Sequence, residues 1–421
     1  MSTLPIFILS FLFSVACCFE RLIFAETYFR HGDRTPVQPL RTGRFNASFY
    51  GNQLGELTPL GTRQGYLLGK KMKKRYVTNL ALLDENFLNL KEIYVRSTDV
   101  NRTLMTANAF TAGMFDYGKR GRDFPDSPDW IPNWTPIPVH TAAMSTDYEG
   151  NPFPLCPRAT ELDQMQLQSQ SFRNLVRDHE DFVASLERFC GEKITVRDSL
   201  TVYGLLDALM ILKKHNLTLP EWATPAVVER LNTISDGQLM LKFGQTGEFG
   251  NNIIRLRGGS KAKTILSRLQ DKWNCFLAKN ETRACLWYGR LKFHAFATHD
   301  MTLWGMLTPF GIVEKVFGKH HEIDHAASVT FELWNADGKP MLNVVFLKNP
   351  GLNEEFQSVT HLIEGCPQDR KFCPLLTVVA ATQKFFPGDL AEECKPKNPK
   401  VTKRSLDGRR REVAFFDGLV W

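Results

Sequence analysis

One short segment near the N-terminus, RHGDRTP, combines closely spaced basic residues with a histidine. It follows the apolar run Leu22–Phe29, which predicts a buried strand, and Pro36 ends that strand. At the tip of the strand, Arg30 and Arg34 flank His31. Arginine's planar fork of donors suits phosphate, and a histidine held between two cations is neutral and therefore nucleophilic. The segment thus predicts phosphoryl transfer; each residue taken alone is equally compatible with a surface charge or a satisfied polar group beside a turn.

A second strand is expected to end in arginine. Ile93–Val95 is a short apolar strand, Arg96 follows it at the exit, and Asn101–Met114 has the spacing of a helix. The carboxyl ends of strands in an open α/β sheet face one crevice, so we expect Arg96 to lie in that crevice. Arg102, inside the predicted helix, is interpreted as structural.

A third strand exit carries a histidine and a carboxylate. Lys292–Ala297 is predicted to be a strand that delivers Thr298, His299 and Asp300 to its exit, before a helix that starts near Met301. Three exits would then bring four cationic side chains, a nucleophile and an acid to one place. Such a set could hold a phosphate and protonate a leaving group without a metal ion.

The elements that position these residues follow from periodicity. Thr58 and Pro59 predict the N-cap and first turn of a helix that runs to about Tyr76. Its glycines fall one turn apart, which predicts close approach to the sheet or to another helix; they are Gly61, Gly65 and Gly69. The later segment FELWNADGKPMLNVVFL predicts a hairpin that adds antiparallel strands at a sheet edge.

The middle of the chain has a different periodicity from the segments around it. After an irregular stretch rich in Pro, Trp, Asp and Gly, helical spacing fills Glu161–Arg188, Leu200–His215 and Pro225–Leu241. We therefore expect an α/β fold, a three-layer sandwich with a mainly parallel central sheet and an inserted, mostly helical cap domain. The catalytic domain would comprise residues 19–129 and 256–394, and the cap residues 130–255.

The two ends of the chain carry processing and charge signals. Residues 1–18 are short and apolar, as in a cleaved signal peptide, and no later stretch is long enough to span a membrane. Of the net charge of +7, residues 395–421 carry +5, which leaves +2 for the rest. Since the charge is concentrated in this basic, flexible tail, the rest of the chain is not expected to bind nucleic acid or a membrane surface.

Three of five glycosylation sequons are expected to be occupied; they start at Asn46, Asn101, Asn133, Asn216 and Asn280.

Seven cysteines remain after the signal, which permits three bridges and one free thiol. Their spacing alone leaves about 105 arrangements open. No pair has the C-x2-C or C-x4-C spacing of a zinc site with histidines nearby. The protein is expected to pass through the secretory pathway, to be secreted or lysosomal, and to need no cofactor.

Over about residues 20–395 the chain resembles the histidine acid phosphatases, a branch of the histidine phosphatase superfamily that includes prostatic and lysosomal acid phosphatases and phytases. RHGDRTP matches every position of the family signature, and THDMT resembles the motif that reads AHDTT in relatives. The resemblance implies that His31 becomes phosphorylated and Asp300 is the proton donor. It also implies a helical insertion and four phosphate-binding residues, carried over onto Arg30, Arg34, Arg96 and His299.

The resemblance also reduces the number of possible disulfide pairings. It implies a local bridge between Cys366 and Cys373 and a long-range one between Cys156 and Cys394. Cys275 and Cys285 then pair by proximity. A cysteine that relatives carry before HNLTLPEWAT is missing, so Cys190 has no assigned partner.

The expected function is an acid phosphatase acting on small-molecule phosphomonoesters, and a homodimer is left open. A phytase or a lysophosphatidate phosphatase would share the mechanism, although the near-neutral body argues against phytate. A mutase of the wider superfamily would lack the signal and sequons. A non-enzymatic binding protein on this fold would have lost one of the six site residues, and none is lost.

Overall fold

The computed structural model describes residues 20–278, 282–283, 285–318, 320, 322–351 and 353–398. The expected signal peptide, the sequon asparagine Asn280 and the tail beyond residue 398 lie outside this range. Among the described residues, no helix is both long and apolar enough to cross a membrane.

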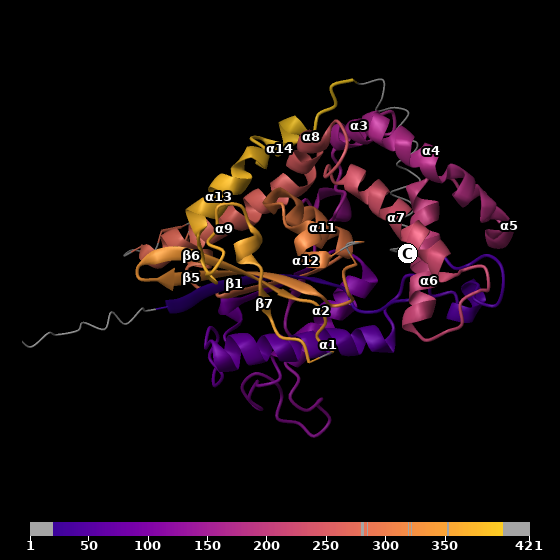
Figure 1. Ribbon diagram of the computed structural model, residues 1–421. Helices are drawn as coiled ribbons and strands as arrows, with labels where there is room; N and C mark the ends of the chain where they lie inside the picture. The colour runs from indigo at the N-terminus through magenta and orange to yellow at the C-terminus, as the bar shows by residue number, and fades with distance from the viewer. Residues whose placement is uncertain are drawn as a thin grey trace, which may run out of the picture.

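A single sheet forms the centre of the molecule (Figure 1). Its strands are β1 (Glu20–Arg30), β2 (Ile93–Ser97), β3 (Val139–His140), β4 (Phe293–Thr298), β5 (Ser328–Ala336), β6 (Lys339–Leu347), β7 (Gln357–Ser358) and β8 (Cys373–Pro374). They run in the order β3-β2-β4-β1-β5-β6-β7, with β8 also paired to β6. The β3-β2-β4-β1 part is parallel. The predicted hairpin, β5 and β6, adds antiparallel pairs beside β1.

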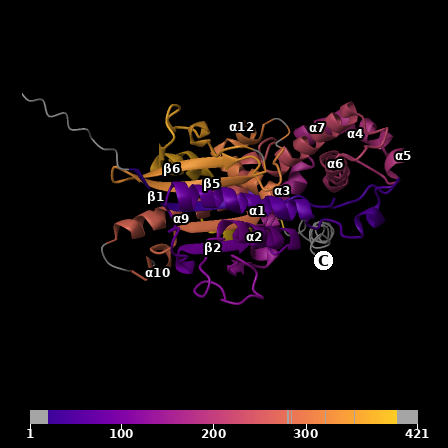
Figure 2. The same cartoon turned by 90° about the horizontal axis from the view of Figure 1, so that it is seen from below.

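Helices cover both faces of the sheet. On one face lie α1 (Pro59–Lys73) and α2 (Asn101–Met114), which are below the strands in Figure 1 and side by side, toward the viewer, in Figure 2. On the other lie α9 (Ser260–Leu277), α11 (Asp300–Leu307), α12 (Val313–Phe317) and α13 (Leu375–Thr382). Two separate apolar clusters fill the layers between helices and sheet. The layered α/β prediction is therefore confirmed.

The predicted glycine row packs α1 against α2. A Cβ on Gly69 would lie 2.1 Å from the carbonyl oxygen of Phe110, so only glycine permits this approach. The prediction left open whether the partner was the sheet or a helix, and the structure shows a helix. Thr58 caps α1 as expected, because its hydroxyl accepts a hydrogen bond from the Gly61 N–H.

The middle of the chain is helical and lies at one end of the sheet (Figure 1). Its helices are α3 (Pro157–Gln166), α4 (Gln170–Ser185), α5 (Glu187–Cys190), α6 (Ser199–Lys214), α7 (Pro225–Lys242) and α8 (Gly250–Ile254). Helices α4 to α7 enclose an apolar cluster of their own, to which Leu40 and Phe45 of the N-terminal segment contribute. A π-helical turn, Arg255–Gly259, joins α8 to α9.

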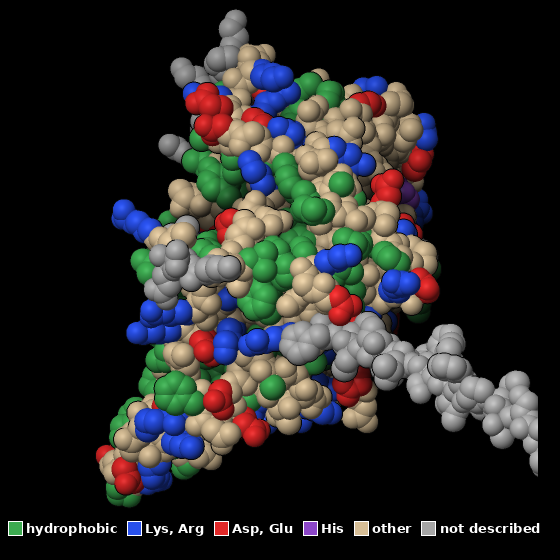
Figure 3. Space-filling model, turned by 90° about the vertical axis from the view of Figure 1, so that its left-hand side faces the viewer, with side chains coloured by type: hydrophobic (Ala, Val, Ile, Leu, Met, Phe, Trp, Pro, Cys, Tyr) green, Lys and Arg blue, Asp and Glu red, His purple; other side chains and the backbone are tan. Residues whose placement is uncertain are grey.

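Two short helices complete the described chain, α10 (Cys285–Tyr288) and α14 (Leu390–Glu393). Among the described residues the disulfides are the three expected pairs: Cys156–Cys394, Cys275–Cys285 and Cys366–Cys373. Cys190 is free and buried. The four described sequon asparagines, Asn46, Asn101, Asn133 and Asn216, are exposed. On the face away from α4 to α7, acidic and basic side chains are interspersed (Figure 3).

Candidate active site

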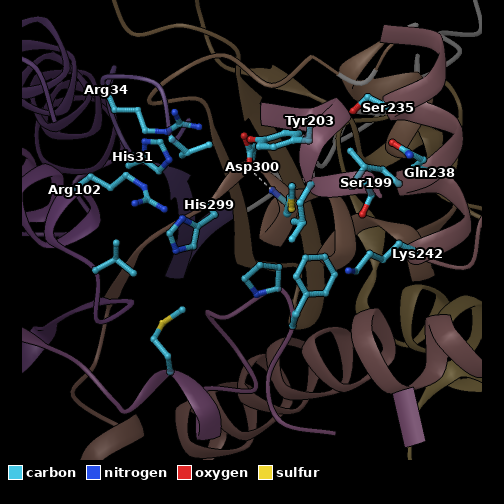
Figure 4. A pocket seen from close by; sticks show the side chains of 18 residues that line it. His31, Arg34, Arg102, Ser199, Tyr203, Ser235, Gln238, Lys242, His299 and Asp300 are labelled. Carbon is cyan, nitrogen blue, oxygen red and sulfur yellow. Dashed lines mark hydrogen bonds between the residues drawn. The ribbon is translucent and has the colours of Figure 1, made fainter. Parts of the chain in front are cut away.

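A cavity opens where β1, β2 and β4 end and where α6 and α7 approach the sheet (Figure 4). The charged and imidazole side chains at its inner end are those of His31, Arg34, Arg102, His299 and Asp300. All three strands are parallel and therefore end at the same edge, which is why segments some 270 residues apart meet here.

His31 is held rigidly at the end of β1. Its backbone N–H donates to Thr298 (2.9 Å), and its carbonyl accepts from Ala326 (3.1 Å). Its Nδ1 lies 2.8 Å from the carbonyl oxygen of Gly32. A carbonyl only accepts, so Nδ1 carries the proton and the lone pair is on Nε2. Burial, followed by the charge of nearby Arg102, lowers the pKa of His31 well below its ordinary value. The lowered pKa therefore favours the neutral ring.

The glycine that follows His31 permits a close contact between two backbones. A Cβ on Gly32 would lie 2.2 Å from the carbonyl oxygen of Gly61 at the start of α1. The Gly32 N–H also donates to Thr106 Oγ1 of α2 (3.0 Å). These contacts fix the loop that carries His31 against both helices of one layer.

Carboxylates orient the two arginines of the RHGDRTP segment. Arg34 makes a bidentate pair with Asp207 of α6, at 2.9 and 3.0 Å. Arg30 pairs with Asp300 at 2.8 Å and also donates to the Ile323 carbonyl. The Nε atoms of both arginines are buried without a hydrogen-bond partner among the described residues. Both guanidinium groups are therefore fixed in place; Arg34 lines this cavity, and Arg30 lines an adjoining one that shares Asp300 with it.

The expected position of Arg96 is wrong, and the reason is the length of its strand. β2 continues through Ser97, so Arg96 is a strand residue and not the exit residue. Its guanidinium pairs with Asp147 (2.9 Å) and Glu149 (3.3 Å) and lies over the ring of Phe296, 4.8 Å from its centroid. It is not among the described residues that line the cavity.

Arg102 takes the place assigned to Arg96. It lies in the first turn of α2, is 5% exposed and lines the cavity beside His31 and His299 (Figure 4). Its Nε and Nη1 are buried without a hydrogen-bond partner among the described residues. Burial, and then the charge of Arg34, lower its pKa to about 10, so it is still a cation. A buried guanidinium with free donors is an anion site.

The exit of β4 presents His299 and Asp300, as predicted. Thr298 and Thr302 both donate to the Gly150 carbonyl, at 2.9 and 2.7 Å, which fixes the turn into α11. Burial and the charge of Arg102 lower the pKa of His299 to about 3. Burial alone would raise the pKa of Asp300, but Arg30 and Arg34 outweigh it and hold that pKa below its ordinary value.

Sequence reasoning missed several residues at this site. One signal could have identified Arg102: it follows β2 as Asp300 follows β4, in the first turn of the next helix. Asp33, within RHGDRTP itself, accepts a hydrogen bond from the Thr58 hydroxyl (2.6 Å), and its carboxylate lies 2.8 Å from Nε2 of His215. Tyr203 and Asp207 come from α6 and had no local signal.

Comparison with known proteins identifies the family of this chain. The family model described as histidine phosphatase superfamily (branch 2) matches residues 21–347. The chain belongs to this family. It is 29% identical to lysosomal acid phosphatase of Xenopus laevis over 394 residues, 92% of this chain and 82% of that protein. Prostatic acid phosphatase of Bos taurus is also 29% identical, over 91% of this chain and 90% of its own.

Solved structures show the same fold for this histidine phosphatase. The apo form of Hafnia alvei phytase superposes with a TM-score of 0.60 at 15% identity, covering 89% of this chain and 98% of the phytase. A phytase from Klebsiella sp. ASR1 gives a TM-score of 0.58 at 17% identity, covering 90% and 100%. At this level of identity the likeness concerns the fold alone.

Proposed function

We propose that this histidine phosphatase is an acid phosphatase that hydrolyses phosphomonoesters through a phosphohistidine on His31. The observation that carries the proposal is the pairing of a neutral, nucleophilic His31 with Arg102, a buried cation whose donors have no partner among the described residues. A phosphoryl group placed there would meet the nucleophile and the donors together. The acid phosphatases it resembles over about nine-tenths of its length support the same activity.

In the first step, Nε2 of His31 attacks phosphorus and the ester P–O bond breaks. Arg30, Arg34, Arg102 and His299 hold the non-bridging oxygens, whose negative charge they stabilise throughout the transfer. Asp300 gives a proton to the departing alcohol oxygen. In the second step, water attacks the phosphohistidine with assistance from ionised Asp300, and phosphate leaves with neutral His31 restored.

The lowered pKa of Asp300 decides where that proton comes from. Asp300 pairs with Arg30, and the charges of Arg30 and Arg34 lower its pKa and so favour the ionised carboxyl. A phosphomonoester has a second pKa near 6 and so arrives in acid with a proton of its own. Its negative charge also weakens the hold of the arginines on the carboxylate, so Asp300 takes up this proton from the phosphoryl group and then passes it to the departing alcohol oxygen. Acid conditions therefore supply both a nucleophile that is still neutral and a proton for the leaving group.

Helices α3 to α7 would form the cap domain. The catalytic domain (residues 19–129 and 256–394) and the C-terminal tail (residues 395–421) would have the bounds expected from the sequence. We place the protein in the secretory pathway, secreted or lysosomal, on the basis of its sequons and disulfides. The sequons left exposed in the structure fit glycosylation. Phytase is the second candidate, because solved phytases share the fold of this chain. A substrate with many phosphates would need more cations around the outer cavity than its described lining offers.

Turnover of p-nitrophenyl phosphate at pH 5 in the presence of EDTA tests the proposal. We expect release of p-nitrophenol and an acid-labile phosphoenzyme during turnover. Absence of turnover from a folded, glycosylated preparation would refute the enzyme and leave a binding protein on this fold. Loss of activity in EDTA, restored by a divalent metal, would refute the metal-free mechanism. Equal or better turnover of phytate would favour the second candidate.

A further inference from the structure

Two threonines behind the cavity wall connect the end of β2 to His299. Thr98 and Thr103 are fully buried and are not among the described residues that line the cavity. Thr98 directly follows β2, and its N–H donates to the Ala297 carbonyl of β4 (3.1 Å). Its hydroxyl oxygen lies 3.0 Å from Nε2 of His299 and 2.8 Å from the Thr103 hydroxyl oxygen. These side chains form a chain of hydrogen bonds that ends on a histidine of the proposed active site.

The direction of these hydrogen bonds follows from the carbonyl groups at their far end. The Thr103 hydroxyl oxygen lies 2.8 Å from the Val100 carbonyl oxygen and 3.0 Å from that of Thr98. Carbonyl oxygens only accept, so the single proton of the Thr103 hydroxyl points to one of them. The Thr98 hydroxyl must then donate its own proton to Thr103, and its oxygen accepts from Nε2 of His299. The neutral His299 ring therefore carries its proton on Nε2.

The two histidines of the site are thus held in opposite tautomers. His31 carries its proton on Nδ1, which faces the Gly32 carbonyl, and offers Nε2 to a ligand. In His299 the nitrogen that remains for a ligand is Nδ1. The two rings lie edge to face beside Arg102, with centroids 5.7 Å apart (Figure 4). A lone pair on Nδ1 would repel an ionised phosphoryl oxygen, so His299 binds that oxygen only when Nδ1 is also protonated.

The charges around His299 keep its ring neutral until a ligand binds. The charged and titratable groups around it are Arg30, His31 and Arg34 after β1, Arg102 on α2, Asp300 on α11, and Tyr203 and Lys242 on α6 and α7 across the cavity. Burial, and then the charge of Arg102, lower the pKa of His299 to about 3, although Asp300 acts in the opposite direction. The negative charge of a bound phosphoryl group favours the protonated ring. Binding should therefore draw a second proton onto His299.

We propose that Thr98 is a positioning residue that holds His299 with a proton on Nε2, so that the ring binds the phosphoryl group through Nδ1 as a cation. The second proton comes from solvent when the phosphoryl group binds and returns to solvent when phosphate leaves. Thr103 supports this arrangement by accepting from Thr98. The role of His299 as a phosphate ligand rests on the proposed phosphatase activity, whereas its tautomer rests on the hydrogen bonds alone.

Nitrogen-15 NMR of the whole protein, labelled at histidine, tests the tautomer without any turnover. At pH 6 without ligand, the His299 signals, assigned by their loss in His299→Asn, should show hydrogen on Nε2 and a lone pair on Nδ1. Sulfate, whose own charge does not change in this range, stands in for the phosphoryl group, and adding it at pH 5 should protonate Nδ1. Hydrogen on Nδ1 of the free protein, or bound sulfate beside an unprotonated Nδ1, would overturn the proposal.

Thr98→Val removes the acceptor and keeps the shape of the side chain. The neutral ring can then carry its proton on Nδ1, so the NMR pattern of His299 should reverse. With p-nitrophenyl phosphate at pH 5, kcat/KM should fall by roughly tenfold, as for the loss of one hydrogen bond. It should also decline less steeply as pH rises, because binding then needs one proton fewer. Thr98→Ser keeps the hydroxyl and should restore both the tautomer and the wild-type pH profile.

Thr111→Val is the matched control. Thr111 is a buried threonine of α2 that does not line the cavity, and its hydroxyl donates to the Asn108 carbonyl (2.8 Å). This variant should keep the wild-type tautomer, rate and pH profile. If Thr98→Val also keeps the wild-type tautomer and pH profile, the positioning role is overturned and the phosphatase proposal survives. If no phosphomonoester is hydrolysed, the phosphatase proposal fails, and NMR of the free protein still decides the tautomer.

Discussion

The two ends of the cavity are built in different ways. At the phosphate-binding end, His31 and the pair His299 and Asp300 lie at strand exits, and Arg102 lies in the first turn of α2, the helix that follows β2. At the outer end, Phe153 comes from a loop and Lys242 from the end of α7, on parts of the chain with no catalytic motif. The cavity thus joins two parts. The sheet part holds the charged groups rigidly, and the helical part determines which leaving groups fit.

This contrast indicates a division of labour. The transferred phosphoryl group is the same in every substrate, so its site depends on rigid elements. The leaving group varies, so its site lies on helices that a change of sequence can reshape without moving His31. Substitutions at the first end should affect all substrates alike, and substitutions at the second should change ratios between substrates.

The largest effect should follow from His31→Ala. The nucleophile is lost and no leaving group can replace it, so kcat should fall by roughly 10⁴-fold or more with p-nitrophenyl phosphate and with glycerol phosphate alike. Steady-state rates and trapping of the phosphoenzyme measure this. His179→Ala, at a partly exposed histidine of α4 outside the cavity, is the control and should retain full activity. A His31→Ala enzyme that retained activity with one substrate would contradict the assignment of the nucleophile.

Asp300→Asn should give the next largest effect and separate substrates by their leaving group. Glycerol phosphate needs a proton on its departing oxygen, so its rate should fall by about 10²- to 10⁴-fold. The phenolate of p-nitrophenyl phosphate leaves without help, so phosphorylation of His31 should be much less affected. Rapid quench at acid and alkaline pH should then reveal an accumulated, base-stable phosphoenzyme. Equal losses on both substrates without that adduct would move the acid role to another group.

Arg102→Ala and Arg96→Ala test whether Arg102, and not Arg96, binds the phosphoryl group. Loss of Arg102 removes donors at the developing charge, so kcat/KM should fall by about 10²- to 10³-fold. Arg96→Ala should leave kcat/KM within a few-fold but lower the thermal midpoint, because it leaves Asp147 buried without its partner. Kinetics and thermal unfolding distinguish the two. The reverse pattern would restore the original assignment.

The smallest effect concerns stability in acid. Burial lowers the pKa of His31, His299 and His325 in the folded protein, that of His299 to about 3. The unfolded chain therefore binds more protons below about pH 6.5, and the free energy of unfolding should fall as pH drops from there. Each group contributes at most about 1.4 kcal/mol per pH unit. Urea unfolding between pH 6.5 and 4.5 measures the slope, and His325→Asn should reduce it. A stability that rises over this range would contradict it.

Sequence patterns were sufficient wherever position depends on a local element. The strand before RHGDRTP, the strand before the HD pair, the capped helix with its glycine row and the NADG hairpin all appear as predicted. In each case the apolar period and a breaker residue determine where the element ends, and the parallel pairing then brings the ends together. Of the four residues proposed to bind phosphate, the sequence patterns therefore indicated three, Arg30, Arg34 and His299, and they also indicated Asp300.

Arg96 and Arg102 show where such patterns fail. Both follow the same apolar strand, and only the hydrogen-bonded register of β2 with β4, which continues to Ser97, decides that Arg96 remains a strand residue. Its side chain then pairs with Asp147 and Glu149, while the next helix turns Arg102 toward His31. A shift of two residues in the end of one strand exchanged the roles of the two arginines.

The outer end of the cavity depended on tertiary structure throughout. Ser199, Phe153 and Lys242 reach it from α6, a loop and α7, and nothing in their neighbouring residues predicts this. Their position depends on how the apolar faces of α4 to α7 pack together and how Arg257 fixes the end of α7. The chemistry of phosphate was therefore determined by short stretches of sequence at strand ends, whereas the choice of alcohol depends on helix packing that only the whole fold decides.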